Sequence, residues 1–91
     1  MLHPDTTTQF ERDKKQALKQ RRDLTVLSRI MKKLIEEQPL EPKYCDHPLR
    51  GDWRGFRDCH IENDWVLIYK VDKEKHKIVF ARLGTHSELF K

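Results

Sequence analysis

Long hydrophobic segments are absent from this sequence. None of its apolar runs approaches the roughly 18 residues that a membrane-spanning helix requires. Residues Met1 to Asp5 also lack the basic region and the apolar stretch of a signal peptide. We therefore expect a cytoplasmic protein that has no membrane partner.

Cysteine is scarce as well. The two cysteines, Cys45 and Cys59, have no CxxC spacing and there is no second pair, so a zinc knuckle is not expected. Two free thiols in a reducing compartment are the simplest interpretation. A disulfide between the two is the alternative.

The length and the charge balance narrow the possible functions. Ninety-one residues suffice for one modest core, so we expect a single domain over residues 1–91. Hydrophobic residues make up 36% of the chain and charged residues 37%, so burial has to be concentrated in a few patterned segments. The formal net charge of +4 and the pI of about 9.2 favour an anionic partner, either RNA or an acidic protein.

The first half of the chain predicts two helices joined by a turn near residues 21–23. In the first helix, which begins near Gln9, apolar side chains recur at i, i+7 and i+8: Phe10, Ala17 and Leu18. In the second, they form a wider stripe: Leu24, Leu27, Ile30, Met31, Leu34 and Ile35. Asp23 is a candidate N-cap. Pro39 disfavours a helical conformation at the residue before it, so the second helix should end near Glu37.

The second half predicts strands. Residues 38–53 are rich in proline and show no period, so we expect a structureless and functional loop there. Alternating or continuously apolar segments then predict three strands, the last ended by Gly84, at residues 56–61, 65–71 and 78–83. The β-branched residues 6–8 favour a further short edge strand. The expected fold class is α+β: an N-terminal helical hairpin packed on a small twisted antiparallel β-sheet, whose other face is left to the loop and the C-terminal tail.

Three histidines in this strand-forming half are candidate catalytic residues: His47, His60 and His86. Histidine exchanges protons near neutral pH because its unperturbed pKa is about 6.5. Cleavage of RNA through its own 2′-hydroxyl needs a base for the 2′ proton, an acid for the leaving 5′ oxygen and cations for the charge on the phosphorane. The three imidazoles can supply the proton-transferring groups.

Neighbouring residues can support this chemistry. Asp58 and His60 alternate along one strand, so both side chains project from the same face. Either Asp58 or Asp64 can orient an imidazole and favour its charged form. A guanidinium fork can hold a phosphate and an aromatic ring can stack on a base; the candidates are Arg57, Arg82 and Phe90.

Each of these residues also has a structural interpretation, as a turn cap, a sheet residue or a plug at the edge of the core. Histidine and aspartate are ligands of zinc and other transition metals. The spacing of His60 and Asp64 lacks the helical HExxH form, however, so we expect no metal and no cofactor. The main alternative function is a non-catalytic basic module that binds RNA or an acidic protein. A co-repressor in a DNA-bound complex is a third.

The same residues resemble the YafQ branch of the RelE superfamily of bacterial type II toxins. The resemblance covers most of the chain, and its specific part consists of these segments: Asp46-His47-Pro48-Leu49, Gly51, Trp53, Gly55, Arg57-Asp58, His60, Asp64-Trp65, Leu67-Ile68-Tyr69-Lys70, Gly84-Thr85-His86 and Leu89-Phe90. It implies a compact α+β fold and a metal-independent, ribosome-dependent endoribonuclease, or mRNA interferase, that cuts translating mRNA in the A site.

The resemblance also implies partners and residue roles. The expected partners are a cognate antitoxin, the 70S ribosome and mRNA, with operator DNA bound indirectly through the antitoxin. Position by position, the catalytic set is His47, His60, Asp64 and His86. The substrate-binding set is Asp58, Arg82 and Phe90, with Arg82 assigned from its position just before Gly84-Thr85-His86.

Overall fold

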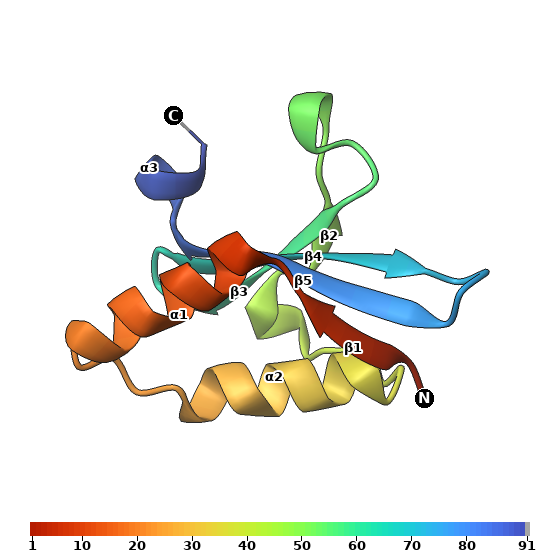
Figure 1. Ribbon diagram of the computed structural model, residues 1–91, viewed down its shortest axis with the longest axis horizontal. Helices are drawn as coiled ribbons and strands as arrows, with labels where there is room; N and C mark the ends of the chain where they lie inside the picture. The colour runs from red at the N-terminus through yellow and green to blue at the C-terminus, as the bar shows by residue number, and fades with distance from the viewer. Residues whose placement is uncertain (91) are drawn as a thin grey trace.

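A five-stranded sheet, in the order β1-β5-β4-β3-β2, organises the fold in the computed structural model, which describes residues 1–90 (Figure 1). The strands are β1 (His3–Thr6), β2 (His47–Pro48), β3 (Arg57–Glu62), β4 (Trp65–Asp72) and β5 (Lys77–Thr85). The helices are α1 (Thr8–Lys19), α2 (Thr25–Ile35) and α3 (His86–Leu89), with 3₁₀ turns η1 (Pro42–Tyr44) and η2 (Gly51–Trp53). The predicted α+β fold is thus confirmed.

The direction of one strand differs from the prediction. Strands β2 to β5 form the expected antiparallel ladders, whereas β1 pairs with β5 in parallel. β1 also begins earlier than the predicted edge strand at residues 6–8, because Thr7 is the N-cap of α1 and its hydroxyl accepts a hydrogen bond from the backbone N–H of Phe10 at 2.9 Å. Sequence periodicity shows where a strand lies but carries no information on the direction of its neighbour.

The two long helices form the predicted hairpin with small differences. Phe10 and Ala17 of α1 are buried, but Leu18 is 56% exposed because it lies about 80° around the helix from Phe10 at 3.6 residues per turn. Asp23 accepts a hydrogen bond from Thr25 N at 2.9 Å, although Leu24 occupies the N-cap position of α2.

The end of α2 comes earlier than predicted. The helix stops at Ile35, and Glu37 takes a left-handed conformation with φ of 59°. Glu37 N then donates to Leu34 O and Gln38 N donates to Lys33 O, which is the Schellman pattern of helix termination. The helix therefore ends two residues before Glu37, the last position that Pro39 would have allowed.

The two faces of the sheet are covered differently. The larger hydrophobic cluster joins α1, α2 and one face of the sheet, around Phe10, Ile30, Leu67, Tyr69 and Phe80. A smaller cluster on the other face combines Val66, Ile68, Ala81 and Leu89 with partly buried Leu49, Trp53, Phe56 and Phe90. Figure 1 shows α1 and α2 on one side of the sheet and α3 with the η2 loop on the other. We call the second side the open face.

A β-bulge in β5 and the end of the same strand shape the open face. Ile68 pairs with Arg82 and Tyr69 with Phe80, so Ala81 is an extra residue in β5 and both Ala81 and Arg82 lie opposite Ile68. The prediction that Gly84 ends this strand was wrong, because Gly84 pairs with Val66 and β5 continues to Thr85. A Cβ at Gly84 would lie 3.1 Å from Glu88 Oε1 and 3.2 Å from Leu89 Cδ2. A larger residue at this position would therefore push against the side chains of α3.

The predicted structureless loop at residues 38–53 is ordered. It contains η1, η2 and the two-residue edge strand β2, which pairs with β3. Such short elements carry too few residues to show a period. Both cysteines are free thiols, as predicted, and burial raises the pKa of the Cys59 thiol to about 12. No helix within residues 1–90 is long and apolar enough to cross a membrane.

Candidate active site

The predicted catalytic histidines come together on the open face. Strand alternation directs Asp58 and His60 of β3 to this face, where they pair with Ile68 and Val66 of β4. β2 places His47 opposite Asp58. His86 is added by α3, which follows directly after β5. These four side chains therefore come from three separate segments of the chain: β2, β3 and α3.

The three imidazoles form a row. The ring centroids of His47 and His60 are 6.3 Å apart, and those of His60 and His86 are 5.0 Å apart. Phe90 continues the row, with its ring centroid 5.8 Å from that of His86. Phe90 also makes an edge contact with Trp53, at a centroid distance of 6.5 Å. The row thus runs from three imidazoles to the aromatic rings of Phe90 and Trp53.

The carbonyl of Cys45 orients His47. Nδ1 of His47 lies 2.7 Å from the Cys45 carbonyl oxygen, and a carbonyl can only accept, so Nδ1 carries a proton. In the neutral ring, Nε2 is then the proton acceptor. His47 is exposed at the edge of the open face, so this nitrogen belongs to an accessible side chain.

Asp58 lies beneath the histidine row. Its side chain is buried, and its Oδ1 is 3.1 Å from His47 Nδ1, but that oxygen accepts no well-aligned hydrogen bond within residues 1–90. Burial raises the pKa of Asp58, an effect that the positive charges of His47, His60 and His86 oppose. Asp58 is thus a buried carboxyl group whose main partners are imidazoles.

Asp64 holds His86. Its Oδ1 accepts from His86 Nδ1 at 2.5 Å and from the His86 backbone N–H at 3.2 Å. The hydrogen bonds from His86 hold the pKa of Asp64 below its usual value. A capping box between Thr85 and Glu88 fixes the start of α3, so the backbone of His86 is held as well as its ring.

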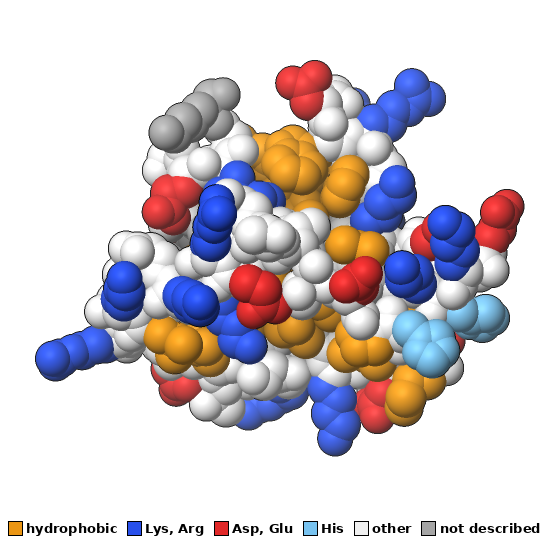
Figure 2. All heavy atoms as spheres, in the orientation of Figure 1, with side chains coloured by type: hydrophobic (Ala, Val, Ile, Leu, Met, Phe, Trp, Pro, Cys, Tyr) orange, Lys and Arg blue, Asp and Glu red, His pale blue; other side chains and the backbone are white. Residues whose placement is uncertain are grey.

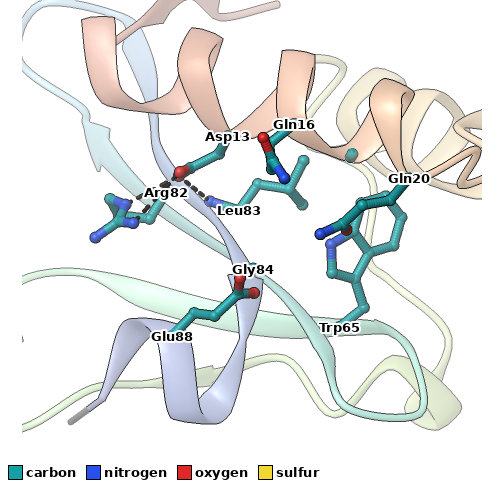
Figure 3. Close-up of a pocket in the computed structure, with 9 residues that line it drawn as sticks. Asp13, Gln16, Gln20, Trp65, Arg82, Leu83, Gly84 and Glu88 are labelled. Carbon is teal, nitrogen blue, oxygen red and sulfur yellow. Dashed lines mark hydrogen bonds and ion pairs between the residues drawn. The ribbon is translucent and has the colours of Figure 1, made fainter.

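Arg82, a predicted phosphate ligand, is paired with α1 (Figure 3). Its Nε and Nη2 donate to the Asp13 carboxylate at 2.9 and 3.3 Å, and Leu83 N donates to the same carboxylate at 2.9 Å. Burial raises the pKa of Asp13, but the hydrogen bonds from Arg82, Leu83 and Gln9 outweigh it, so the pKa is lowered overall. Asp13 therefore anchors β5 to the helix at the bulge.

The other candidates are placed as follows. Arg57 donates through Nε to Asp46 Oδ1 at 3.2 Å, so its fork is engaged by a carboxylate. Trp65 is buried and Trp53 packs in the smaller hydrophobic cluster, so both are packing residues. No three His, Cys, Asp or Glu side chains within the described part of the chain are arranged to hold one metal ion.

The sequence interpretation missed two acidic residues that support the site. Asp13 contacts Arg82 from 69 positions away, and Asp46 contacts Tyr69 from 23 positions away. Neither contact leaves a local pattern in the sequence. For Asp46, the only signal was its place directly before His47.

The chain is similar to known bacterial toxins over nearly its whole length. The family described as “Bacterial toxin of type II toxin-antitoxin system, YafQ” matches residues 2–91. The mRNA interferase toxin YafQ of Escherichia coli strain K12 is 45% identical over 83 residues, which cover 90% of this chain and 88% of that protein.

Two solved structures show the same likeness in three dimensions. A metal-bound toxin from Helicobacter pylori has 43% identity and a TM-score of 0.93, covering 99% of this chain and all of that one. A chain of the E. coli DinJ–YafQ complex has 41% identity and a TM-score of 0.91, with full coverage of both chains. The likeness thus includes every element that builds the open face.

Proposed function

Because this chain belongs to the YafQ family of bacterial toxins of type II toxin–antitoxin systems, we propose that it is an mRNA interferase, an endoribonuclease that cuts mRNA on the translating ribosome. The observation that carries the proposal is the row of His47, His60 and His86 on one sheet face, with carboxylates against two of them. Its place of action is the cytoplasm, where ribosomes translate.

The proposed reaction uses the RNA's own 2′-hydroxyl as the nucleophile. A base removes the 2′ proton, the 2′ oxygen bonds to the adjacent phosphorus, and the bond from phosphorus to the 5′ oxygen breaks. An acid protonates the leaving 5′ oxygen. The products are a 2′,3′-cyclic phosphate and a 5′-hydroxyl. Because protein side chains supply both the base and the acid, the reaction requires no metal ion.

The geometry suggests how the proton-transferring roles are divided. In neutral His47, Nε2 is a proton acceptor because Nδ1 donates to the Cys45 carbonyl, so we assign His47 as the base. His86 donates from Nδ1 to an anionic acceptor, the Asp64 carboxylate, whereas His47 donates to a neutral carbonyl, so we assign His86 as the acid. His60 lies between them and stabilises negative charge when it is protonated.

The remaining candidates position the substrate. Asp13 occupies Nε and Nη2 of Arg82, so Nη1 is the nitrogen that we propose contacts a phosphate oxygen. Phe90 offers a ring at the end of the histidine row on which a base can stack. Asp58 lies beneath the imidazoles, with its Oδ1 3.1 Å from His47 Nδ1, and helps to orient the His47 ring.

The proposed partners follow from the family and the charge. The E. coli DinJ–YafQ complex pairs a YafQ toxin with another protein, and we propose that an antitoxin likewise neutralises this chain and links it to operator DNA. Lys and Arg side chains spread over the face shown in Figure 2, with Asp and Glu among them. Together with the net charge of +4, they suit binding to the 70S ribosome and mRNA.

The experiment that tests this function compares two substrates. Purified protein is incubated with mRNA bound to programmed 70S ribosomes and with the same mRNA free in solution, and cut sites are mapped by primer extension. We expect cleavage on ribosomes and slow or absent cleavage of free mRNA. Equal rates would contradict ribosome dependence, and no cleavage of either by folded protein would favour a non-catalytic RNA-binding module.

A similar Helicobacter pylori toxin exists in a metal-bound form. We nevertheless assign the cleavage to side-chain acid–base chemistry, because three imidazoles lie next to one another on one face of the sheet, with carboxylates against two of them. Expression in a bacterium should arrest growth, and co-expression of the antitoxin should restore it. A pure co-repressor would instead be harmless.

A further inference from the structure

β2, the strand that carries His47, is weakly tied to the sheet by its backbone. It has two residues, of which Pro48 has no N–H to donate. The next backbone bond is from Leu49 N to Phe56 O, at 2.9 Å. A two-residue edge strand supplies little support for a side chain that must hold one orientation, so other contacts have to fix it.

Asp46, directly before β2, provides such a contact. Its Oδ1 accepts hydrogen bonds from Tyr69 Oη at 2.6 Å and from Arg57 Nε at 3.2 Å. Tyr69 is 2% exposed in the central strand β4, and Arg57 is its ladder partner on β3. The carboxylate is therefore anchored to the two adjacent strands β3 and β4, and its Tyr69 donor is buried in the middle strand of the sheet.

The hydrogen bond from Tyr69 to Asp46 and the active site lie on opposite faces of the sheet. Tyr69 belongs to the hydrophobic cluster beneath α1 and α2, whereas His47 pairs with Asp58 on the open face. Neighbouring residues of an extended segment project to opposite sides. Fixing Asp46 on the helix-covered side thus fixes the direction in which the next side chain leaves the sheet.

The two hydrogen bonds that Asp46 accepts also restrain the Cys45 carbonyl, which selects the tautomer of His47. Cys45 has a left-handed φ of 49°, and its carbonyl accepts the Nδ1 proton of His47 at 2.7 Å. A residue other than glycine keeps this conformation only where its surroundings impose it. Asp46 stands between Cys45 and His47, so its two hydrogen bonds restrain both ends of the contact.

We propose that Asp46, held by Tyr69 and Arg57, is a positioning residue that keeps His47 in its Nδ1–H tautomer with Nε2 free to accept a proton. The consequence for cleavage rests on the proposed function, in which His47 is the base. The tautomer itself is a property of the free protein and can be measured without RNA.

Nitrogen-15 NMR of the histidine side chains tests the proposal. Neutral His47 in the wild type should show a protonated Nδ1. Asp46→Ala should shift it toward the Nε2–H form or an average of the two, and Tyr69→Phe should do so in part because it deletes one donor and keeps the ring. Asp46→Asn retains an acceptor for Tyr69 and should retain more of the wild-type tautomer. Asp52→Asn, at an exposed position in η2, is the matched control and should change nothing.

The kinetic readout separates this inference from the proposed function. Single-turnover cleavage on saturating programmed ribosomes should fall roughly 10- to 100-fold in Asp46→Ala, with ribosome binding unchanged. A folded Asp46→Ala or Tyr69→Phe variant that keeps a fully protonated Nδ1 would overturn the inference, whatever its rate. A shifted tautomer with wild-type cleavage in both Asp46→Ala and His47→Gln would support the positioning and refute the catalytic role of His47.

Discussion

Asp64 holds His86 through two contacts to one oxygen: Oδ1 accepts from both the ring Nδ1 and the backbone N–H of His86. The turn between β3 and β4 is thereby tied to the start of α3, two elements that are 22 residues apart in sequence. Because ring and backbone are restrained together, the imidazole can hold its place in the row beside His60. This is the geometry expected of a group that transfers a proton at a defined atom.

Replacing Asp58 should improve stability and impair cleavage. Its folded-state pKa is raised, so the stability from this group is greatest below its ordinary pKa and falls as pH rises through the raised value. At pH 7 the ionised carboxylate therefore costs stability. Asp58→Asn should raise the free energy of unfolding by on the order of 1 kcal/mol while lowering cleavage. Urea unfolding at pH 7 and single-turnover kinetics measure the two effects; a less stable, fully active variant would contradict the account.

Asp13 should stabilise the fold in a pH-dependent way. Its folded-state pKa is lowered, so its contribution is present above the ordinary value of 3.8 and is lost as pH falls through the lowered one. Asp13→Ala should cost about 2–3 kcal/mol at pH 7, because Arg82 and Leu83 N lose their acceptor. Denaturant unfolding measured between pH 7 and pH 2 gives the free energy of unfolding at each pH. As the pH falls, this free energy should decrease less steeply in Asp13→Ala than in the wild type. Glu11→Ala, at an exposed position of the same helix, is the control, and an equal loss there would refute the assignment.

Phe90 should affect substrate positioning and not proton transfer. An aromatic stack is worth about 1–3 kcal/mol per base, so Phe90→Ala should lose about 5- to 150-fold in cleavage. The pH profile should keep its shape, and Phe90→Tyr should recover most of the rate because it keeps the ring. Since Phe90 also packs against Trp53, the melting temperature is measured in parallel. A displaced pH optimum in a folded Phe90→Ala variant would argue against a stacking role.

Cleavage should not depend on a metal ion. The protein is treated with EDTA and then exchanged into a buffer that keeps the ribosomes intact. Because histidines supply the base and the acid, the rate of cleavage on programmed ribosomes should not change. The upstream fragment should end in a 2′,3′-cyclic or 3′ phosphate, which 2′-hydroxyl attack produces. A 3′-hydroxyl end, or a rate restored only by a transition metal, would indicate metal-assisted hydrolysis instead.

Much of the fold could be predicted from periodicity because its strands and helices are long enough to show one. Two patterns predicted the helical layer and the sheet layer: the stripe of Leu27, Ile30 and Leu34 in α2, and the apolar run of β4. The direction of β1, the two-residue β2 and the continuation of β5 past Gly84 could not be predicted, since pairing partners and a close approach by α3 decide them.

The residues of the candidate site could be predicted from the sequence, but the contacts between them and their supporting residues could not. Strand alternation placed Asp58 and His60 on the same face. Residue type and position made His47, His86 and Phe90 candidates, and the resemblance to a toxin family pointed to the same residues. The engagement of Arg82 by Asp13 depends on how α1 packs on the β5 bulge, which no local pattern encodes. The roles of these residues in cleavage stay predictions.

Single-turnover cleavage of mRNA by His86→Gln on saturating programmed ribosomes tests whether the histidine row cleaves RNA by proton transfer. Glutamine keeps the size and hydrogen-bonding capacity of the side chain but does not titrate near neutral pH. We expect His86→Gln to lose about 10²–10⁴-fold in cleavage rate and to keep its ribosome binding. His76→Gln, at an exposed position in the β4–β5 turn, should cleave at the wild-type rate. Cleavage near the wild-type rate by folded, ribosome-bound His86→Gln would contradict the claim.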